Sequence, residues 1–183
     1  MNLVLRKSRP SDFPFLRNIL YEAVFWRASP DRPSLEEGLA YPEVEKALAG
    51  WGERDGDIAV VATVDSTPAG ACWFRYWADD NHVIGYVEEN TPVLVIGVLR
   101  AYRHQGLGRR MIKWLVDHAS RHSIQQISLS VSKDNHAIDL YRQQGFLEYA
   151  DRGDAYTMVR RIPKWQSALT SSPEATADRG ATT

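Results

Sequence analysis

The sequence predicts a mixed α/β protein with a single domain. Two kinds of periodicity indicate this fold class: some segments carry apolar residues every three or four positions, as helices do, and shorter segments alternate apolar with polar residues, as strands do. They follow one another in the order strand, one or two helices, three strands, helix, strand, helix and two strands. With 183 residues, 44% of them hydrophobic, the chain is long enough to bury one core. We expect that domain to span residues 1–162.

The overall composition argues against several classes of protein. A formal net charge of -1 and a sequence pI of about 6.5 do not indicate a broad nucleic-acid-binding surface. No apolar run reaches the ~20 residues that a membrane span needs, and the N-terminus lacks the apolar core of a signal peptide. The one cysteine, Cys72, has no partner for an internal disulfide and is expected to be a packed thiol. The expected location is therefore the cytoplasm.

The first half of the chain is predicted to hold two helical segments among four strands. After a short strand at 2–6, the sequence Pro10-Ser11-Asp12 starts a helix, and Ser11 or Asp12 is a suitable N-cap. A stretch rich in Pro, Ser and Asp at 29–34 ends this helix. The segments that follow are a helix through Val44 to Gly50, strands at 58–64 and 71–77 joined by a tight turn at 66–68, a polar loop at 78–92, and a strand at 93–99.

The second half is predicted to alternate helices with strands. Apolar residues fall on one helical face in the first segment, and three of them alternate with serines in the second. Asp134 or Asn135 caps the later helix, and Gly145 stands just past its end. The predicted elements are a helix at 105–120, a strand at 127–132, a helix at 135–144, strands at 146–149 and 156–161 around a turn at 151–154, and a flexible tail at 163–183.

The residues that follow the strand at 93–99 are the most informative in the chain. The spacing Arg103-x-x-Gly106-x-Gly108 places two glycines in a turn that leads directly into a helix. Backbone N–H groups at a helix N-terminus have no partners inside the helix and attract anions, so this turn is typical of a phosphate site. A dinucleotide-binding fingerprint would need a third glycine where Met111 stands, and a P-loop would need Gly-Lys-Ser/Thr where Gly108 is followed by two arginines.

Two motifs together resemble the GCN5-related N-acetyltransferase (GNAT) family. The first is Val-x-x-x-x-Arg/Gln-x-x-Gly-x-Gly/Ala, which begins at Val98, and the second is Asn-x-Ala-x-x-Leu-Tyr-x-x-x-Gly-Phe over 135–146. The resemblance covers residues 3–162 and is strongest from 93 to 149. It implies a central, mixed, mostly antiparallel sheet flanked by helices, with strands splayed apart where acetyl-CoA binds.

By the same resemblance, the cofactor lies along the strand and turn of the first motif. The pantetheine arm would bond to the main chain between Ile96 and Val98, where a side chain on Gly97 could crowd it. The pyrophosphate would lie on backbone N–H groups up to Arg109; Arg110 could add charge there or be a solvated helix start. The implied cofactor-binding residues are Ile96, Gly97, Val98, Arg103, His104, Gln105, Gly106, Leu107, Gly108, Arg109, Asn135 and Tyr141, and no metal is implied.

The resemblance also implies that Tyr141 is the general acid. Transfer of an acetyl group to an amine releases a CoA thiolate, which a nearby tyrosine hydroxyl can protonate. Without the motif, Tyr141 would be expected to pack on the core side of its helix beside Leu140. Asn135 occupies a cofactor-contact position of the family, although a helix cap needs no ligand to explain it.

The general base is not evident from the sequence. A protonated amine must lose a proton, to a base or a water chain, before it can attack. The two positions where family members carry a carboxylate hold Val93-Leu94-Val95-Ile96 and Ser130 here. Glu88 and Glu89, a few residues before that strand, are therefore the candidate bases, although adjacent acids in a loop are more often solvated. Further candidates are Glu22 and His82.

The acceptor side is predicted less sharply. In the family, the first two helices and the loop 78–92 form the substrate wall, and this chain places many aromatic residues there, most of which core packing explains. Trp26 and Tyr86 are the predicted wall residues, because each adjoins a polar segment and could contact a cationic amine. The acids of the loop could attract a positively charged acceptor: Asp79, Asp80, Glu88 and Glu89.

Three hypotheses about function follow. The first is an enzyme that transfers an acetyl group from acetyl-CoA directly to a primary amine of a small molecule, peptide or protein. The second is a domain that binds acyl-CoA without turnover, which the missing carboxylates favour and Tyr141 argues against. The third is transfer of a longer acyl group. The enzyme is the prediction carried forward. A homodimer is compatible with the family, and neither nucleic acid nor a membrane is an expected partner.

Overall fold

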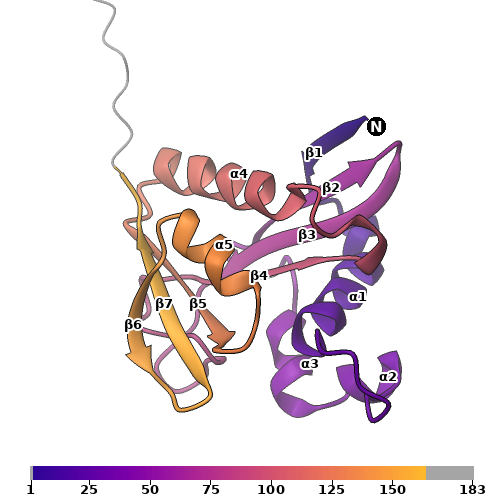
Figure 1. Cartoon of the computed structure of the whole chain (residues 1–183). Helices are drawn as coiled ribbons and strands as arrows, with labels where there is room; N and C mark the ends of the chain where they lie inside the picture. Colours follow the sequence, from indigo (N-terminus) through magenta and orange to yellow (C-terminus); the bar gives the residue numbers. More distant parts are fainter. Residues whose placement is uncertain (1, 164–183) are drawn as a thin grey trace, which may run out of the picture.

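The computed structural model, which describes residues 2–163, is built around a seven-stranded sheet (Figure 1). The strand order is β1-β2-β3-β4-β5-β7-β6, and all neighbours are antiparallel except β4 and β5, which are parallel. The predicted mixed, mostly antiparallel sheet is therefore confirmed. The strands are β1 (Leu3–Lys7), β2 (Ile58–Val64), β3 (Thr67–Arg75), β4 (Val93–Val98), β5 (Gln126–Ser132), β6 (Leu147–Asp151) and β7 (Ala155–Arg161).

Helices cover both faces of this sheet, and each face has its own apolar core. Alternation along β2 divides its side chains between the two cores: Val60 and Ala62 contribute to one, and Ala59 and Val61 to the other. One face carries α4 (Leu107–Arg121) and α5 (Ala137–Gln143); the other carries α1 (Phe13–Val24), α2 (Leu35–Leu39) and α3 (Pro42–Leu48). Two short 3₁₀ turns are at Pro10–Asp12 and Arg100–Tyr102.

The predicted elements are found in the predicted order, with corrections at their ends. The turn between β2 and β3 is at Asp65 and Ser66, which both have positive φ, so that Thr67 already belongs to β3. The short helix α2 was not predicted; Ser34 starts it with a capping box, because its hydroxyl accepts from the N–H of Glu37 and its own N–H donates to the Glu37 carboxylate.

The predicted N-caps are partly wrong. Asp12 directly precedes α1, but its carboxylate makes no cap bond and instead accepts from the Arg6 guanidinium at 2.7 and 2.8 Å and from the N–H of Arg9 at 2.7 Å. Charge-assisted bonds to an arginine are stronger than a cap bond, which explains the exchange. Helix α5 begins at Ala137, and Asn135 rather than Asp134 bonds to its start, through Oδ1 and the N–H of Ala137 at 2.9 Å.

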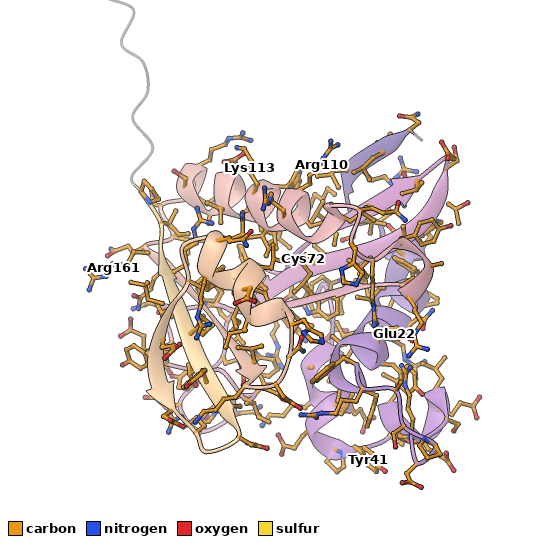
Figure 2. All side chains as sticks on the ribbon, viewed as in Figure 1. Glu22, Tyr41, Cys72, Arg110, Lys113 and Arg161 are labelled. Atoms are coloured by element: carbon orange, nitrogen blue, oxygen red, sulfur yellow. The ribbon has the colours of Figure 1, made fainter. Side chains whose placement is uncertain are left out.

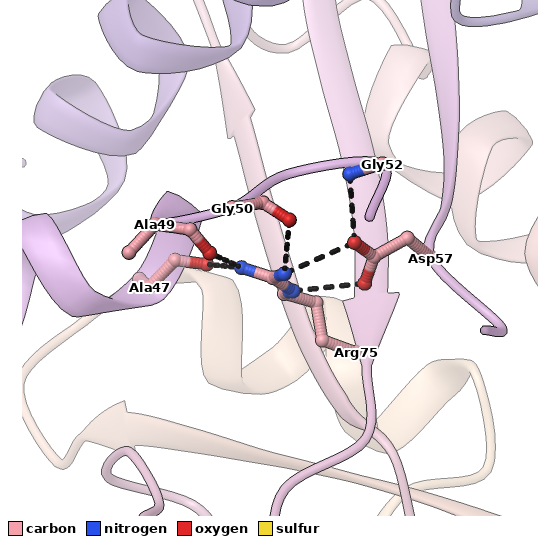
Figure 3. A network of polar contacts seen from close by, with 6 residues as sticks. All are labelled: Ala47, Ala49, Gly50, Gly52, Asp57 and Arg75. Atoms are coloured by element: carbon pink, nitrogen blue, oxygen red, sulfur yellow. Dashed lines mark hydrogen bonds and ion pairs between the residues drawn. The ribbon is translucent and has the colours of Figure 1, made fainter. Parts of the chain in front are cut away.

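A buried cluster around Arg75 fixes the end of α3 to the sheet (Figure 3). The Arg75 guanidinium donates from Nε and Nη2 to the two carboxylate oxygens of Asp57, at 2.8 and 3.0 Å, and the two side chains are only 1% and 3% exposed. Its remaining donors reach carbonyl oxygens at the end of α3 and just after it, so that every polar atom of the guanidinium has a partner. Those carbonyls belong to Ala47, Ala49 and Gly50.

The structure also bears on two composition-based predictions. Cys72 is fully buried on β3 as a free thiol, which confirms that it is a packed thiol. Within residues 2–163 no helix is both long and apolar enough to cross a lipid bilayer. The predicted tail lies outside the described residues from position 164 onward.

Candidate active site

Strands β4 and β5 diverge soon after they begin, which leaves a gap between their backbones. They pair only at Val93 and Ser128, where the Ser128 N–H donates to the carbonyl of Pro92 at 3.1 Å. On the other edge of β4, the Leu99 N–H donates to Ala69 on the β3 side. Because backbone groups alternate between the two edges of a strand, the N–H and C=O groups of Ile96 and Val98 point into the gap and lack a strand partner.

Gly97 serves a different purpose from the one that the sequence indicates. The same alternation turns its backbone groups toward β3, where it pairs with Ala71. A Cβ at Gly97 would lie 2.8 Å from Ile19 Cγ2 and 2.9 Å from the Ile19 carbonyl oxygen on α1. The glycine therefore lets α1 approach β4, and its missing side chain does not leave room for a ligand.

The predicted phosphate turn has the geometry of an anion site. His104 and Gly106 both have positive φ, at 60° and 79°, and α4 begins directly afterwards. The first backbone bond of the helix runs from the Arg110 N–H to Gly106, so the preceding N–H groups, from Leu107 to Arg109, have no partners inside the helix. A fifteen-residue helix adds the positive end of its dipole at this point.

The two glycines of the turn act in different ways. Gly106 has open space around its Cα, so its positive φ is what requires glycine. A Cβ at Gly108 would lie 3.0 Å from Leu140 Cδ2, so this glycine lets α5 approach the start of α4. The side chains of Gln105 and Arg109 are used within the protein: Gln105 donates to the carbonyl of Ala101 and Arg109 to Gln143 on α5.

Arg103, also predicted to contact the cofactor, belongs to a cluster with Glu22 and Arg32. Its Nε donates to the Val98 carbonyl at 3.0 Å and its Nη2 to Glu22 Oε2 at 3.0 Å. The other oxygen of Glu22 accepts from Arg32 Nη2 at 2.9 Å. Glu22 lies on α1, near the segment that leads from β4 into α4 (Figure 2). Because two guanidiniums hold this carboxylate, Glu22 is a poor general base.

Tyr141 lies on α5 and is buried in the core shared with α4. The residue is 7% exposed, and its ring makes an edge contact with Phe146 at 5.9 Å between centroids. Burial, with a smaller contribution from Cys72, raises the pKa of Tyr141 well above its usual value. The phenol is therefore protonated at neutral pH, as a proton donor must be.

The loop 78–92 closes the paired end of the gap. Gly85, buried and at φ +95°, has its Cα against the Leu129–Ser130 peptide, since a Cβ there would lie 2.8 Å from the Ser130 nitrogen. The next residue, Tyr86, stacks on His82 at 4.4 Å and donates its hydroxyl proton to Asp79. Burial and the nearby acids raise the pKa of Tyr86 to about 12. Tyr86, which the sequence predicts to line the acceptor site, thus lies next to the glycine that covers the paired end of the gap.

The two predicted bases have different surroundings in this loop. Glu88 Oε1 accepts from Gln126 Nε2 at 2.8 Å and from Thr91 Oγ1 at 3.1 Å. Gln126 precedes Ser128 by two residues, about 7 Å along the strand, so Glu88 lies on the closed side of the gap. Glu89 is exposed, and its charge contributes to the raised pKa of Tyr86.

Trp26 and its neighbour Arg27 lie on the side of the gap formed by α1. The Arg27 guanidinium covers the Trp26 ring at 4.5 Å and forms an ion pair with Asp134, at 2.7 Å, in the turn between β5 and α5. This pair joins the two sides of the gap. Trp73 and Trp77 are buried, as core packing predicts for most of the aromatic residues.

Sequence reasoning missed three arginines that line this region. Arg27, Arg32 and Arg100 follow α1 or β4, and no motif spacing marks them. Arg27 pairs with Asp134, 107 residues away, and Arg32 with Glu22, 10 residues away. In residues 2–163, no group of three or more His, Cys, Asp or Glu side chains is placed to hold a metal ion.

Comparisons with known proteins agree with this geometry. Residues 21–146 match the model of the Acetyltransferase (GNAT) family. The chain resembles an acetyltransferase of the GNAT family from Streptococcus pneumoniae, with a TM-score of 0.64 and 20% identity over 88% of this chain and 100% of that chain. At such identity the likeness shows the fold.

Two further solved structures have the same fold. PaiA N-acetyltransferase from Thermoplasma acidophilum, in complex with coenzyme A, has a TM-score of 0.64 and 17% identity over 88% of this chain and 99% of that chain. The ribosomal-protein-S18-alanine N-acetyltransferase from Escherichia coli has a TM-score of 0.61 and 19% identity over 92% and 99%. No curated protein sequence matches the chain.

Proposed function

The chain belongs to the acetyltransferase (GNAT) family, and we propose that it transfers the acetyl group of acetyl-CoA directly to a primary amine. Family membership supports acetyl transfer from acetyl-CoA in general; the amine acceptor and the direct transfer are our proposal. One observation carries it: backbone groups of Ile96 and Val98 that lack a strand partner face the β4–β5 gap, next to the N–H groups at the start of α4 that have no partner inside the helix.

The residues present fit acetyl-CoA. An extended amide-containing arm can bond to the N–H and C=O groups of Ile96 and Val98 as a further strand would. The N–H groups from His104 to Arg109 would hold the pyrophosphate. When bound, acetyl-CoA would supply an activated thioester. We propose that Asn135, whose side chain bonds the start of α5, keeps Tyr141 in place beside the gap.

Tyr141 is our proposed general acid. As the amine nitrogen bonds to the acetyl carbon and the carbon–sulfur bond breaks, the Tyr141 hydroxyl would donate its proton to the departing sulfur. The raised pKa of the phenol keeps its proton in place at neutral pH until the thiolate forms.

For the base we propose Glu89 in preference to Glu88. The amine must lose a proton, and the Glu88 carboxylate is already held by Gln126 and Thr91, whereas that of Glu89 is not engaged by any hydrogen bond in the described residues. We expect Glu89→Gln to lower kcat/KM at neutral pH, directly or through a water, and Glu88→Gln to leave it unchanged. Equal effects of the two variants would contradict this assignment.

The first test of the function is cofactor binding. Thermal unfolding with acetyl-CoA or CoA at 100 times the dissociation constant is expected to show about 2.7 kcal/mol of added stability, because the ligand binds only the folded chain. Gly106→Val is the matched variant. The φ of 79° at this position is unfavourable for valine, so we expect the variant to lose both the phosphate turn and the stabilisation by the cofactor. Absence of a shift in the parent protein would contradict the proposed function.

The second test separates an enzyme from a domain that only binds acyl-CoA. Tyr141→Phe keeps the ring and its contact with Phe146 but removes the proton. We expect kcat to fall by about 10²-fold or more with unchanged affinity for CoA, measured as thiol release in the presence of amines. If the parent protein binds CoA but releases no thiol with any amine, the binding domain becomes the better description.

The expected partners are acetyl-CoA and an amine acceptor, with a homodimer as an arrangement to be tested by light scattering. A buried free thiol at Cys72 is compatible with a reducing cytoplasm.

A further inference from the structure

The region where α1 ends beside β4 contains more positive than negative charge. Glu22 is one carboxylate between two guanidiniums, those of Arg32 and Arg103, and all three side chains are largely buried, with 16%, 20% and 29% exposed. Arg100, three residues before Arg103, adds a third guanidinium. Within residues 2–163 no carboxylate lies within ion-pair distance of Arg100. These four side chains therefore carry an excess of two positive charges.

Arg32 also has an unused donor. Its Nε is buried and has no hydrogen-bond partner, while its Nη2 bonds to Glu22 and its guanidinium stacks on the Tyr21 ring at 4.3 Å. An unsatisfied buried donor on a charged group costs free energy unless a ligand or water accepts its hydrogen bond. A small movement of this side chain would offer Nε to an oxygen ligand.

An open depression of about 420 Å³ is lined by two of these arginines, Arg32 and Arg100. None of the residues that line it is acidic: they are Ala28, Ser29, Pro30, Arg32 and Arg100. The neighbouring depression of about 290 Å³ does include an acid, Asp31, and its other arginine, Arg27, is already paired with Asp134. The first depression is therefore where an added anion would find uncompensated charge.

Its place in the fold separates this depression from the proposed phosphate site. Arg100 lies two residues after the end of β4 and lines the depression with residues that follow α1. The free N–H groups of the phosphate turn are at the start of α4, where Arg109 reaches α5 by its bond to Gln143. The depression and the phosphate turn are thus lined by different residues of the segment 100–109.

We propose that this depression binds a carboxylate carried by the amine acceptor. The inference rests on the proposed function and narrows its substrate class to amines with an acidic group, such as amino acids. Arg100 and Arg32 would hold the carboxylate by charge-assisted hydrogen bonds, and this anchoring would direct the amine toward the gap beside Ile96. Arg100 is then a specificity-determining residue.

The test compares acceptors that differ only in the carboxylate. The common amino acids are assayed beside their amides, with acetyl-CoA saturating and thiol release as the readout. We expect kcat/KM to be about 10- to 100-fold higher for the acids, as a charged hydrogen bond is worth. Arg100→Gln is expected to remove this difference by raising the acceptor KM, and Arg100→Lys to retain part of it. Arg17→Gln, which removes an exposed charge on α1, is the control and is expected to change neither.

The outcomes separate this inference from the proposed function. Acetylation of amides as efficient as that of acids would overturn the inference while the function stands. An increase in the KM of acetyl-CoA in Arg100→Gln, with unchanged acceptor KM, would also overturn it, because the depression would then serve the cofactor's phosphates. If no acceptor turns over, calorimetric titration of the same amino acids into the CoA-bound protein decides: binding that Arg100→Gln weakens supports the inference, and no binding overturns it.

Discussion

Two clusters of arginine and carboxylate in this fold differ in how their charges are balanced. In the Arg75 cluster, one guanidinium meets one carboxylate, Asp57, and three carbonyl oxygens, and almost nothing is exposed to solvent. In the Glu22 cluster, one carboxylate is shared by Arg32 and Arg103, Arg100 lies nearby with no ion-pair partner among residues 2–163, and one buried donor is unused.

The balance of charge and hydrogen bonds distinguishes a structural cluster from a binding site. A buried ion pair offsets its desolvation only when each polar atom has a partner, and the Arg75 cluster meets that condition. A cluster with surplus charge and an orphan donor gains little stability for the fold, but it is complementary to an anion. We therefore expect the Arg75 cluster to matter for stability and the Glu22 cluster for ligand recognition.

The largest effect is expected from the Arg75 cluster. Asp57→Ala leaves the Arg75 charge buried without its counter-ion, and Arg75→Ala leaves Asp57 without its counter-ion and the carbonyls at the end of α3 without these donors, so each should cost about 3–5 kcal/mol of unfolding free energy. Denaturant titration with circular dichroism measures this cost. The double variant Arg75→Met with Asp57→Leu removes both charges and should be more stable than either single variant.

That recovery should be incomplete, because the carbonyls of Ala47, Ala49 and Gly50 would still lack donors. A loss of unfolding free energy below about 1 kcal/mol in both single variants would contradict the structural role of the Arg75 cluster. The cluster would then contribute no more to stability than an ion pair on the surface.

An intermediate effect is expected at Arg6 and Asp12, a pair with 29% and 10% of its side chains exposed. The Arg6 hydrogen bonds hold the pKa of Asp12 below its usual range, so Asp12 contributes stability that is present above about pH 4 and is lost as the pH falls through its folded-state pKa. Asp12→Asn should cost about 1–2 kcal/mol at pH 7, allowing for screening at Arg6, and should flatten the decline of stability on the acid side.

The acid limb is measured by urea titrations between pH 3 and 7. A parallel decline in Asp12→Asn and the parent protein would show that other carboxylates account for it. The Arg6–Asp12 pair would then contribute as little to stability as a solvent-exposed ion pair, and its effect would not be intermediate between those of the two clusters.

The fold could be predicted well where the signal is local. The strand-turn-helix junction around Gly106 and the Asn135–Phe146 segment are set by residues within one or two turns of each other, and both are found as expected. The short helix α2 had a local signal too, the Ser34 and Glu37 capping box, but five residues give too little periodicity to identify a helix.

The site could be predicted only in part, because its charges come together from distant positions. Glu22 looks like a candidate base until Arg103, 81 residues away, is seen to hold it. The pair Arg27 and Asp134 is separated by 107 residues and has no sequence signature. Gly97 illustrates a different limit: the glycine was recognised as functional, but only the fold shows that it faces Ile19 on α1.

The smallest effect on stability is expected in the Glu22 cluster. The change in Tm on addition of an anion then shows whether this cluster is a binding site or a structural cluster. Glu22→Gln leaves the Arg103 bond to Val98 in place and removes a carboxylate that water partly reaches, so we expect a loss of only about 1 kcal/mol. The same variant raises the surplus positive charge from two to three. Inorganic phosphate, added at constant ionic strength, should therefore raise Tm more in Glu22→Gln than in the parent protein, and Arg100→Gln should weaken that gain. A loss as large as that of Asp57→Ala, with no response to phosphate, would make the Glu22 cluster a structural one, because the carboxylate would then be needed to hold α1 against the segment after β4.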